Sequence, residues 1–519
     1  MSGNRQLSMR EVAAMGRVRK LFLKLGRRND FVKGQGIYRN FLRKYPLSDE
    51  IHWEYVDFSL KCRQWADAFR SLKALIALYG NGAERDRVVM KIAEIYRDLG
   101  QVGEAERRLV SGLRVRPKSI VLRRALLELS ALLDHGVLGF ELYLGQLGSD
   151  EFGAADEGDR FKMILSCVAM LRYRGRWEEA DELLLNYGER GSPLWQESLI
   201  DGYHRIVVYC NGRTRMEYRT KILDIATGEF TRSRQMVVTF DTMLQNWDSL
   251  PYSYKPLAPR AVDFLSVRKA SKTDFHQDFS REEFKSVAVP LVGNYDDVVA
   301  IGQSLGGYSS LYYAVSLPGC RVLASAPRNP QNPKHSGPQY SRYDLFRHEY
   351  DMMGHADATP TIVYDPKNSE DGPYVERLLR RSFPKARFVA YPYCGHSIPR
   401  FLLEVGLLKA TTFAFCDGIP FPEFDRSLRG KSAEYLRNLA RINYAAGRPK
   451  LAVALLERAL ELGTYPERTQ VLLEKIQKQL TSDSSFKVAS KVAKTRSFRS
   501  DAMRWLRMRL AGLMKGKRG

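Results

Sequence analysis

Seven short runs of β-branched and other apolar residues, between residues 201 and 425, constrain the fold of this chain more than any other feature. Stretches with helical character alternate with these runs, which cover 205–210, 236–240, 262–267, 297–301, 321–326, 359–364 and 386–392. Runs that are nearly continuous in apolar residues are typical of strands buried on both faces. Strands that alternate with helices predict a parallel sheet with crossover helices. We therefore predict an α/β domain over residues 201–425.

The flanking residues have helical periodicity with recurrent small side chains. The segment 91–117 resembles a tetratricopeptide repeat, because its preferred positions are occupied by Ala93, Tyr96, Gly100, Ala105, Leu109, Gly112 and Pro117. Small residues at such positions allow two antiparallel helices to approach. Weaker copies lie around Trp65, around Trp177 and at 438–466. Helical repeats are therefore predicted on both sides of the α/β domain.

These patterns divide the 519 residues into four predicted parts: a repeat domain over 1–200, the α/β domain over 201–425, a helical hairpin over 426–480 and a tail over 481–519. The tail carries eleven Lys or Arg from residue 484 onward, with Asp501 as the single acid. Its last part can form an amphipathic helix around Trp505. Such a helix predicts binding to an anionic membrane surface, with a solvated basic extension as the alternative.

Composition narrows the choice of partners. The chain has 82 Lys and Arg against 59 Asp and Glu, a formal net charge of +23, which favours anionic partners such as lipid head groups, acidic glycans or nucleic acid. Nucleic acid is the least expected of these, because no nucleic-acid-binding fold is recognisable.

Six well-separated cysteines without a C-x-x-C pair predict reduced thiols, and we expect neither a metal nor a cofactor. With no recognisable signal peptide or spanning segment, we expect a cytoplasmic protein, peripheral to a membrane at most.

One motif within the α/β segment points to chemistry. Residues 302–306 read G-x-S-x-G, directly after the strand predicted at 297–301 and directly before a helical run. In a nucleophile elbow a serine occupies a strained turn between strand and helix, and Gly302 and Gly306 would leave room for that turn. With the strand pattern, the region 201–425 resembles the α/β-hydrolase superfamily. Its members share an eight-stranded, mostly parallel sheet with helices on both faces and a Ser, acid, His triad in that chain order.

This resemblance implies roles for particular residues. Ser304 would be the nucleophile, and His396, in the loop after the last strand, would be its base. The acid would follow the preceding strand. Asp371, just ahead of the next helix, is favoured there over Asp365, which ends the strand and can instead cap backbone N–H groups, and Glu370 is the third candidate.

The oxyanion hole of this family uses two backbone N–H groups. The first would come from Leu305, and the second from the loop after the 236–240 strand, where Thr242 or Met243 is the candidate. That loop lacks the HGGG-type glycines of lipases, so the sequence departs from the family pattern at this point.

The segment 327–358 lies where many family members insert a cap over the active site. Its polar side chains would recognise a polar or anionic acyl or sugar group, or would be a solvated loop; they include His335, Tyr340, Arg342, Arg347 and His348.

The leading hypothesis is a serine hydrolase that cleaves a carboxylic ester or thioester through an acyl-enzyme. Its substrate would be a lipid, an acylated glycan or an acyl carrier, and the repeats would recruit a protein or a polymer that carries the ester. Two alternatives stay open. One is an acyltransferase with the same triad, and the other is an adaptor whose repeats and basic tail bind proteins or anionic surfaces.

Overall fold

The computed structural model describes most of the chain, namely residues 9–28, 30–45, 48–133, 140–141, 144–187, 199–332, 346–349, 352, 355, 357–464 and 466–482. The basic part of the tail and three of the cap residues, His335, Tyr340 and Arg342, lie outside these ranges. The hypotheses made for them stay predictions.

The chain divides into two compact units. The first comprises Met1–Val238 and Gln245–Val298, and the second comprises Thr239–Leu244 and Val299–Gly519. The second unit therefore holds the G-x-S-x-G motif together with the beginning of the loop that follows the 236–240 strand.

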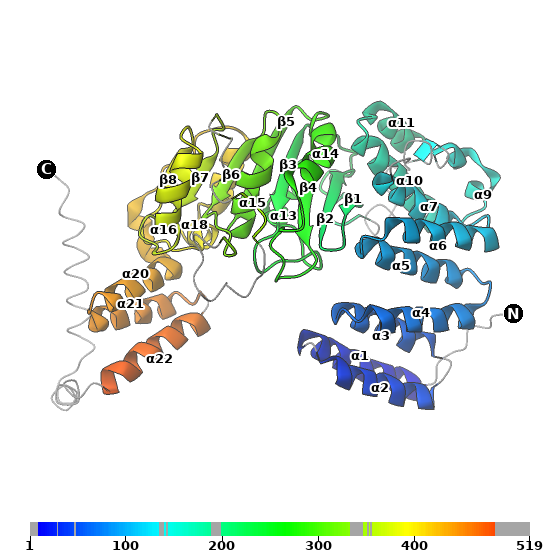
Figure 1. Ribbon diagram of the computed structural model, residues 1–519, viewed down its shortest axis with the longest axis horizontal. Helices are drawn as coiled ribbons and strands as arrows, with labels where there is room; N and C mark the ends of the chain where they lie inside the picture. The colour runs from blue at the N-terminus through cyan, green and yellow to red at the C-terminus, as the bar shows by residue number, and fades with distance from the viewer. Residues whose placement is uncertain are drawn as a thin grey trace. The chain divides into compact units, whose positions relative to one another are not determined.

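The strands form one eight-stranded sheet in the order β1-β2-β4-β3-β5-β6-β7-β8 (Figure 1). They are β1 (Tyr203–Cys210), β2 (Thr214–Lys221), β3 (Gln235–Phe240), β4 (Val262–Lys269), β5 (Asp297–Gln303), β6 (Arg321–Ser325), β7 (Thr361–Tyr364) and β8 (Arg387–Ala390). Strands β5, β6, β7 and β8 run parallel to one another, whereas β2 is antiparallel to both β1 and β4. The predicted α/β class and mostly parallel sheet are confirmed, and each of the seven predicted runs is a strand.

Strand β2 is the one that the sequence pattern missed. All eight of its residues are buried, although four of them are charged. Its neighbours in the sheet supply the compensation, because Glu217 lies opposite Val207 of β1 and Ser266 of β4, with arginines from both strands around it. Without an apolar run or an alternating pattern, nothing local to 214–221 predicts a buried strand.

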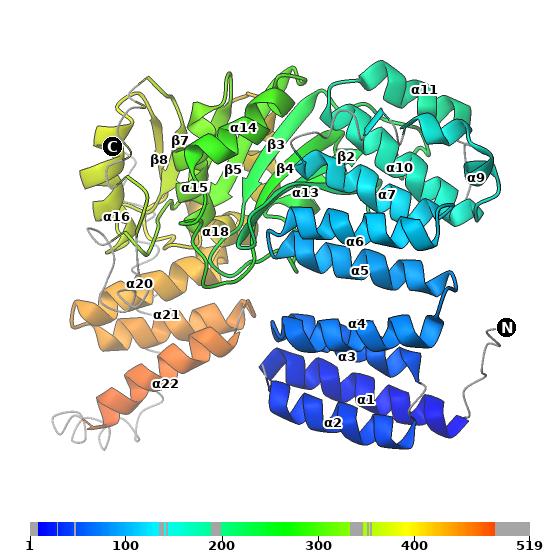
Figure 2. The ribbon, with the colours of Figure 1, turned by 45° about the vertical axis from the view of Figure 1, so that its right-hand side comes forward.

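The N-terminal residues form a succession of helices that stack in pairs, as Figure 1 and Figure 2 both show for α3 to α6. They are α1 (Met9–Arg28), α2 (Phe31–Lys44), α3 (Asp49–Lys61), α4 (Trp65–Tyr79), α5 (Glu84–Asp98), α6 (Val102–Val115), α7 (Ile120–Leu129), α9 (Asp150–Gly153), α10 (Glu157–Tyr173) and α11 (Trp177–Tyr187), with short 3-10 turns at Ser130–Leu132 and Gly145–Gly148. Buried Ala68, Leu72 and Ile95 belong to one core that α3, α4 and α5 share.

Small residues allow these helices to approach closely. A Cβ atom at Gly112 of α6 would lie 2.8 Å from Leu122 Cδ1 of α7 and 3.0 Å from Val89 Cγ1 of α5. Ala93 and Ala105 are buried at the same junction. The helical pairs thus occur where the sequence predicts repeats, while their assignment to the tetratricopeptide class stays a prediction.

Shorter helices accompany the strands. They are α13 (Tyr254–Leu257), α14 (Arg281–Val292), α15 (Leu305–Tyr313), α16 (Asp371–Tyr374), α17 (Arg380–Ser382), α18 (Ile398–Glu404) and α19 (Leu408–Cys416), with 3-10 turns at Ala314–Ser316 and Arg426–Lys431 and a π-helical turn at Val375–Leu379. A capping box begins α14, in which Ser280 Oγ accepts from Glu283 N and Glu283 Oε2 accepts from Ser280 N.

Three helices lie in residues 433–482, where the sequence predicts a hairpin of two. They are α20 (Ala433–Ala445), α21 (Pro449–Glu461) and α22 (Pro466–Ser482), which lie in successive layers in Figure 2. Ser432 caps α20 by accepting from Tyr435 N, and Pro449 occupies the first turn of α21. Buried residues of all three helices, including Leu436, Leu456 and Ile476, form one core.

All six cysteines are free thiols, as predicted, and only Cys320 is partly exposed. Among the helices of the described ranges, none has the length and apolar character that a membrane crossing requires.

Candidate active site

The G-x-S-x-G motif folds as a strained turn between β5 and α15. Ser304 has φ +55° and ψ −120°, a backbone conformation that L residues rarely adopt and that costs of order 1–3 kcal/mol. Backbone hydrogen bonds hold it there: Ser304 N donates to Ser325 O of β6 at 2.9 Å, and Ser304 O accepts from Tyr308 N at 2.9 Å and from Arg328 N at 3.1 Å. Strand β6, the segment after it and helix α15 thus hold the serine in this strained conformation.

Both motif glycines are required by close backbone approach. A Cβ atom at Gly302 would lie 2.1 Å from Gly306 O, and a Cβ atom at Gly306 would lie 2.5 Å from Phe240 O at the end of β3. Real Cβ atoms never come so close to backbone oxygen. The turn therefore accepts only glycine at these two positions, as expected for a nucleophile elbow.

The structure brings together Ser304, His396 and Asp371. His396 Nε2 lies 2.8 Å from Ser304 Oγ, and His396 Nδ1 lies 2.8 Å from Asp371 Oδ2. The side chain of Asp371 is 1% exposed, whereas that of His396 is 31% exposed. A buried carboxylate, a half-buried imidazole and a hydroxyl thus form one hydrogen-bonded chain that ends near solvent.

Asp365 has a different environment. Its Oδ1 accepts from Lys367 N at 2.8 Å and from Tyr393 N at 2.9 Å, and its Oδ2 accepts from Gly395 N at 2.7 Å. The carboxylate therefore links the end of β7 to the loop that carries His396. This is the capping contact that the sequence offered as the alternative for Asp365, and it leaves Asp371 as the acid in contact with the imidazole.

Two residues that the sequence reasoning did not single out position the acid. Asn368 Oδ1 accepts from Asp371 N at 2.9 Å and from Glu370 N at 3.0 Å, which fixes the start of α16. The Arg328 guanidinium pairs with Glu370 and lies 3.6 Å from Asp371 Oδ1. An asparagine three residues before an acid is a helix-capping signal that can be found in sequence, whereas the approach of Arg328 depends on tertiary packing.

His348 of the predicted cap is buried. Its Nδ1 lies 3.0 Å from the Tyr308 hydroxyl and its Nε2 lies 3.0 Å from the Tyr313 hydroxyl, and its ring stacks on Tyr312. Both ring nitrogens contact hydroxyl groups of α15. His348 therefore anchors its own segment to the elbow helix, which contradicts the idea that it recognises a substrate.

The candidate oxyanion donors adjoin the elbow. Leu305 N belongs to the first residue of α15, directly after Ser304. The close approach of Phe240 O to Gly306 brings the end of β3 beside the elbow, and Thr242 follows two residues later. Thr242 and Met243 are half-buried. Their role as the second donor stays a prediction.

Helix α20 contacts the loop that carries His396. Asn438 Nδ2 donates to Cys394 O at 3.0 Å. Gly395 has φ +74°, and a Cβ atom there would lie 2.2 Å from Asn438 Nδ2. Burial, followed by the charges of Asp365 and Asp371, raises the pKa of the Cys394 thiol, so this cysteine stays protonated. The C-terminal helices thus brace the histidine loop, a contact that no local sequence signal revealed.

No family model matches the chain, and no curated protein matches it. Solved structures do match. Est1E from Butyrivibrio proteoclasticus is 11% identical over 41% of this chain and 99% of its own, with a TM-score of 0.28. The 2,6-dihydroxy-pseudo-oxynicotine hydrolase is 12% identical over 53% and 82%, with a TM-score of 0.30. MGS-MChE2, an alpha/beta hydrolase enzyme from a sediment metagenome of the Mar Chica lagoon, is 15% identical over 36% and 87%, with a TM-score of 0.23. Likeness at this level carries no conclusion about the chemistry of this chain.

Proposed function

We propose that this protein is a serine hydrolase that cleaves a carboxylic ester or thioester through an acyl-enzyme intermediate. The observation that carries the proposal is the hydrogen-bonded chain from Ser304 Oγ through His396 to buried Asp371, which begins at a strained elbow. A turn of this strain is found where function requires it, and a serine, a base and an orienting acid in one chain are the parts of an activated nucleophile.

In the proposed mechanism, His396 Nε2 accepts the proton of Ser304 Oγ as the oxygen attacks the carbonyl carbon. Asp371 accepts a hydrogen bond from His396 Nδ1, which selects the required tautomer and stabilises the imidazolium that forms. The backbone N–H groups of Leu305 and Thr242 would bind the negatively charged oxygen of the tetrahedral intermediate. His396 then protonates the leaving group, and a water molecule, deprotonated by His396, releases the acyl group.

The substrate class is less constrained than the reaction class. A lipid ester, an acylated glycan and an acyl carrier all present the required carbonyl, and transfer to an alcohol instead of water would use the same groups. The N-terminal helices would recruit the protein or polymer that carries the ester.

The test is covalent labelling of the purified full-length protein with a fluorophosphonate probe, followed by mapping of the modified peptide. We expect a single adduct on Ser304 and none in Ser304→Ala. Ser310→Ala is a matched control, because Ser310 Oγ is buried and donates to Gly306 O at 2.9 Å within the same helix. Labelling elsewhere, or none in a folded protein, would exclude the hydrolase and favour the adaptor.

A further inference from the structure

An open groove of about 1080 Å³ lies within the first unit. One wall comes from helices α3, α4 and α5, and the other comes from β2 and from the loops after β3 and β4. The groove shares no residue with the Ser304 site. Three features indicate what the groove can bind: a residue with unusual backbone geometry, the charges of the lining residues and their aromatic rings.

The outlier is Arg63, in the turn between α3 and α4. In the four helix pairs where the sequence predicts repeats, the first helix ends in the same way, with a backbone bond that spans five residues: Gln64 N to Ser59 O, Gln101 N to Tyr96 O, Arg176 N to Leu171 O and Arg448 N to Asn443 O, at 2.8–2.9 Å. This turn requires a residue with positive φ, and three pairs have glycine there: Gly100, Gly175 and Gly447, with φ between 71° and 76°.

Arg63 occupies the equivalent position with φ +57°. An L residue in this left-handed conformation costs roughly 1 kcal/mol relative to glycine. At Gly100 and Gly175 a Cβ atom would also clash, 2.6 Å from Asn211 C and 2.5 Å from Asn294 Oδ1. A Cβ atom at Gly447 would meet no other atom within 4 Å, so the backbone conformation by itself accounts for the glycine in that turn. Arg63 lines the groove. Arg63 thus has a strained backbone at a position where the other three pairs have glycine. A binding role of its side chain in the groove is the best explanation for this strain.

The charges of the groove favour an anion. Among the described residues, three lining cations, Lys61, Arg63 and Lys272, take part in no ion pair. Two of the four lining acids are paired: Asp98 contacts Arg97 and Arg215, and Glu94 contacts Lys91, which leaves the carboxylates of Asp57 and Asp248 against the three cations. The groove therefore presents more unneutralised positive than negative charge.

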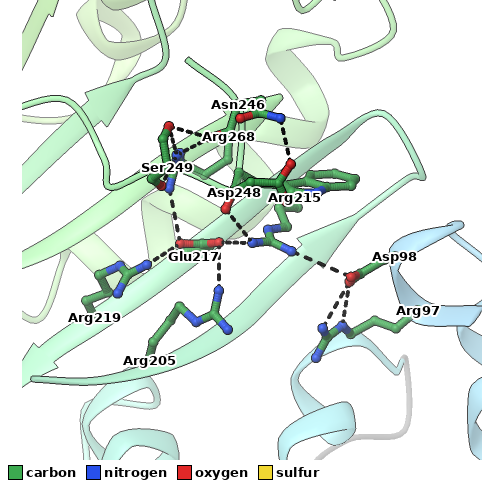
Figure 3. Close-up of polar contacts among 11 residues, drawn as sticks. Arg97, Asp98, Arg205, Arg215, Glu217, Arg219, Asn246, Asp248, Ser249 and Arg268 are labelled. Carbon is green, nitrogen blue, oxygen red and sulfur yellow. Dashed lines mark hydrogen bonds and ion pairs between the residues drawn. The ribbon is translucent and has the colours of Figure 1, made fainter. Parts of the chain in front are cut away.

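Beside the groove, positive charge is also in excess in the interior. Figure 3 shows Glu217 surrounded by arginines, with Arg215 reaching from it to Asp98. Arg215 lines the groove, its side chain is 6% exposed, and within the described part of the chain its Nε has no hydrogen-bond acceptor. A buried guanidinium with an unused donor is a second, independent indication of an anionic ligand.

The remaining lining residues select among anions. Trp65 and Trp247 both line the groove, and Arg215 stacks on the Trp247 ring at 4.6 Å. Asp57 and Asp248 line it as well and can accept hydrogen bonds from hydroxyl groups. A uniform polyanion would be repelled by these carboxylates, whereas a sugar chain offers apolar ring faces to indoles, hydroxyls to carboxylates and a carboxylate to the cations.

We propose that this groove binds an acidic sugar chain, with Arg63 as the residue that recognises its carboxylate groups. The proposal does not depend on the hydrolase activity, because the groove and the Ser304 site have no residue in common. The decisive variant is Arg63→Gly, which restores the glycine of the other three turns and removes only the side chain.

The experiment measures binding of fluorescent oligogalacturonate to the full-length protein, with a neutral cello-oligosaccharide as the comparison ligand. We expect the acidic probe alone to bind, with an affinity that falls as salt is raised. Arg63→Gly should weaken binding roughly tenfold, as the loss of one charged contact does, while its melting temperature is unchanged or higher. Lys285→Gln is the matched control, an exposed cation of α14 outside the groove, and should bind as the wild type does.

Four results would overturn the proposal. Unchanged binding in Arg63→Gly would remove the groove from the interaction. Equal binding of the neutral probe would remove the role of charge. Binding of polyphosphate or poly-glutamate, but not of oligogalacturonate, with the same dependence on Arg63 would assign the groove to another anion. A lower melting temperature in Arg63→Gly would contradict the strain on which the argument depends.

Discussion

Two groups of polar side chains in this protein are each built around a buried carboxylate, Asp371 in one and Glu217 in the other, but they have different partners. In the second unit, Asp371, His396 and Ser304 form a chain of hydrogen bonds that leads from a carboxylate with 1% exposure to an imidazole with 31% exposure. In the first unit, the carboxylate of Glu217 is fully buried and contacts the guanidinium groups of Arg205, Arg215 and Arg219, with Arg268 at 3.5 Å. The first group places its imidazole toward solvent, whereas in the second the central carboxylate is buried and only the outer arginines reach the surface.

The two groups differ in the kind of side chain that contacts the buried carboxylate, and this difference decides whether the group can take part in a reaction or only stabilise the fold. An imidazole can change its charge near neutral pH, so the chain at Ser304 can pass a proton. A guanidinium stays charged, so the cluster at Glu217 can only hold its members in place. Backbone strain follows the same division, because Ser304 has φ +55° whereas no residue of β2 has a positive φ.

The largest expected effect comes from removing the proton chain. Ser304→Ala and His396→Ala should each lower ester turnover by roughly 10⁴-fold or more, because a hydroxyl without its base is a weak nucleophile. Both proteins should keep the wild-type melting temperature, since neither change empties the core. Turnover of small soluble esters and thermal denaturation measure the two quantities, and a His396→Ala protein with native turnover would place the base elsewhere.

The two neighbouring aspartates should separate activity from stability. Asp371→Asn should lower turnover by roughly 10³- to 10⁴-fold with little loss of stability, because an amide cannot stabilise the imidazolium and favours the wrong tautomer. Asp365→Asn should chiefly lower the melting temperature, since its carboxylate accepts three backbone N–H groups. Kinetics and thermal melts on both variants decide the matter, and the reverse pattern would reassign the acid to Asp365.

Glu217→Gln should destabilise the first unit without changing the chemistry. Loss of the one carboxylate among four arginines leaves buried positive charge uncompensated, at a cost of about 3–5 kcal/mol in the free energy of unfolding. Asp296→Asn, which breaks an exposed pair with Arg234, is the control with little expected effect. Denaturant melts provide the measurement. A Glu217→Gln protein as stable as the wild type would show that the charge of Glu217 does not hold the cluster together.

The stability difference between wild type and Glu217→Gln should also depend on pH. Burial by itself would raise the pKa of Glu217, but the surrounding arginines outweigh it and lower that pKa below its ordinary value. The stabilisation is then fully present above the unfolded pKa and is lost as the pH falls below about 4. Melts at pH 7 and at decreasing acid pH should show the two proteins converging, and a constant difference would contradict this assignment.

The smallest expected effect tests the brace on the histidine loop. Asn438→Ala removes the hydrogen bond to Cys394 O and leaves a gap beside Gly395. Because the histidine loop is then held less firmly, kcat should fall about tenfold, which corresponds to the free energy of one hydrogen bond, while KM stays unchanged. Asn443→Ala is the matched control, because Asn443 lies in the same helix and its side chain donates to Leu439 O of that helix and not to the histidine loop. Equal kcat values for the two variants would mean that α20 does not position His396.

Much of the second unit could be predicted from sequence because its signals are local. The elbow needs Gly302 and Gly306 within a few residues of Ser304, and buried parallel strands appear as apolar runs. The placement of His396 and the preference for Asp371 followed from the family resemblance, which implies a histidine and an acid in the loops after particular strands. Strand β2, the approach of Arg328 to Asp371, the burial of His348 and the brace from Asn438 had no such signal.

The sequence alone therefore determined the α/β class, seven of the eight strands and the elbow, because apolar periodicity and the steric demands of a tight turn act between near neighbours in the chain. The resemblance added His396 and a short list of candidate acids. Only the tertiary structure decided that a strand with four charged residues is buried, that Asp365 holds a loop while Asp371 contacts the imidazole, and that the C-terminal helices support His396. The physical reason is that a buried charge or polar group is tolerated only where partners from distant segments compensate it, and such partners are set by folding and not by spacing along the chain.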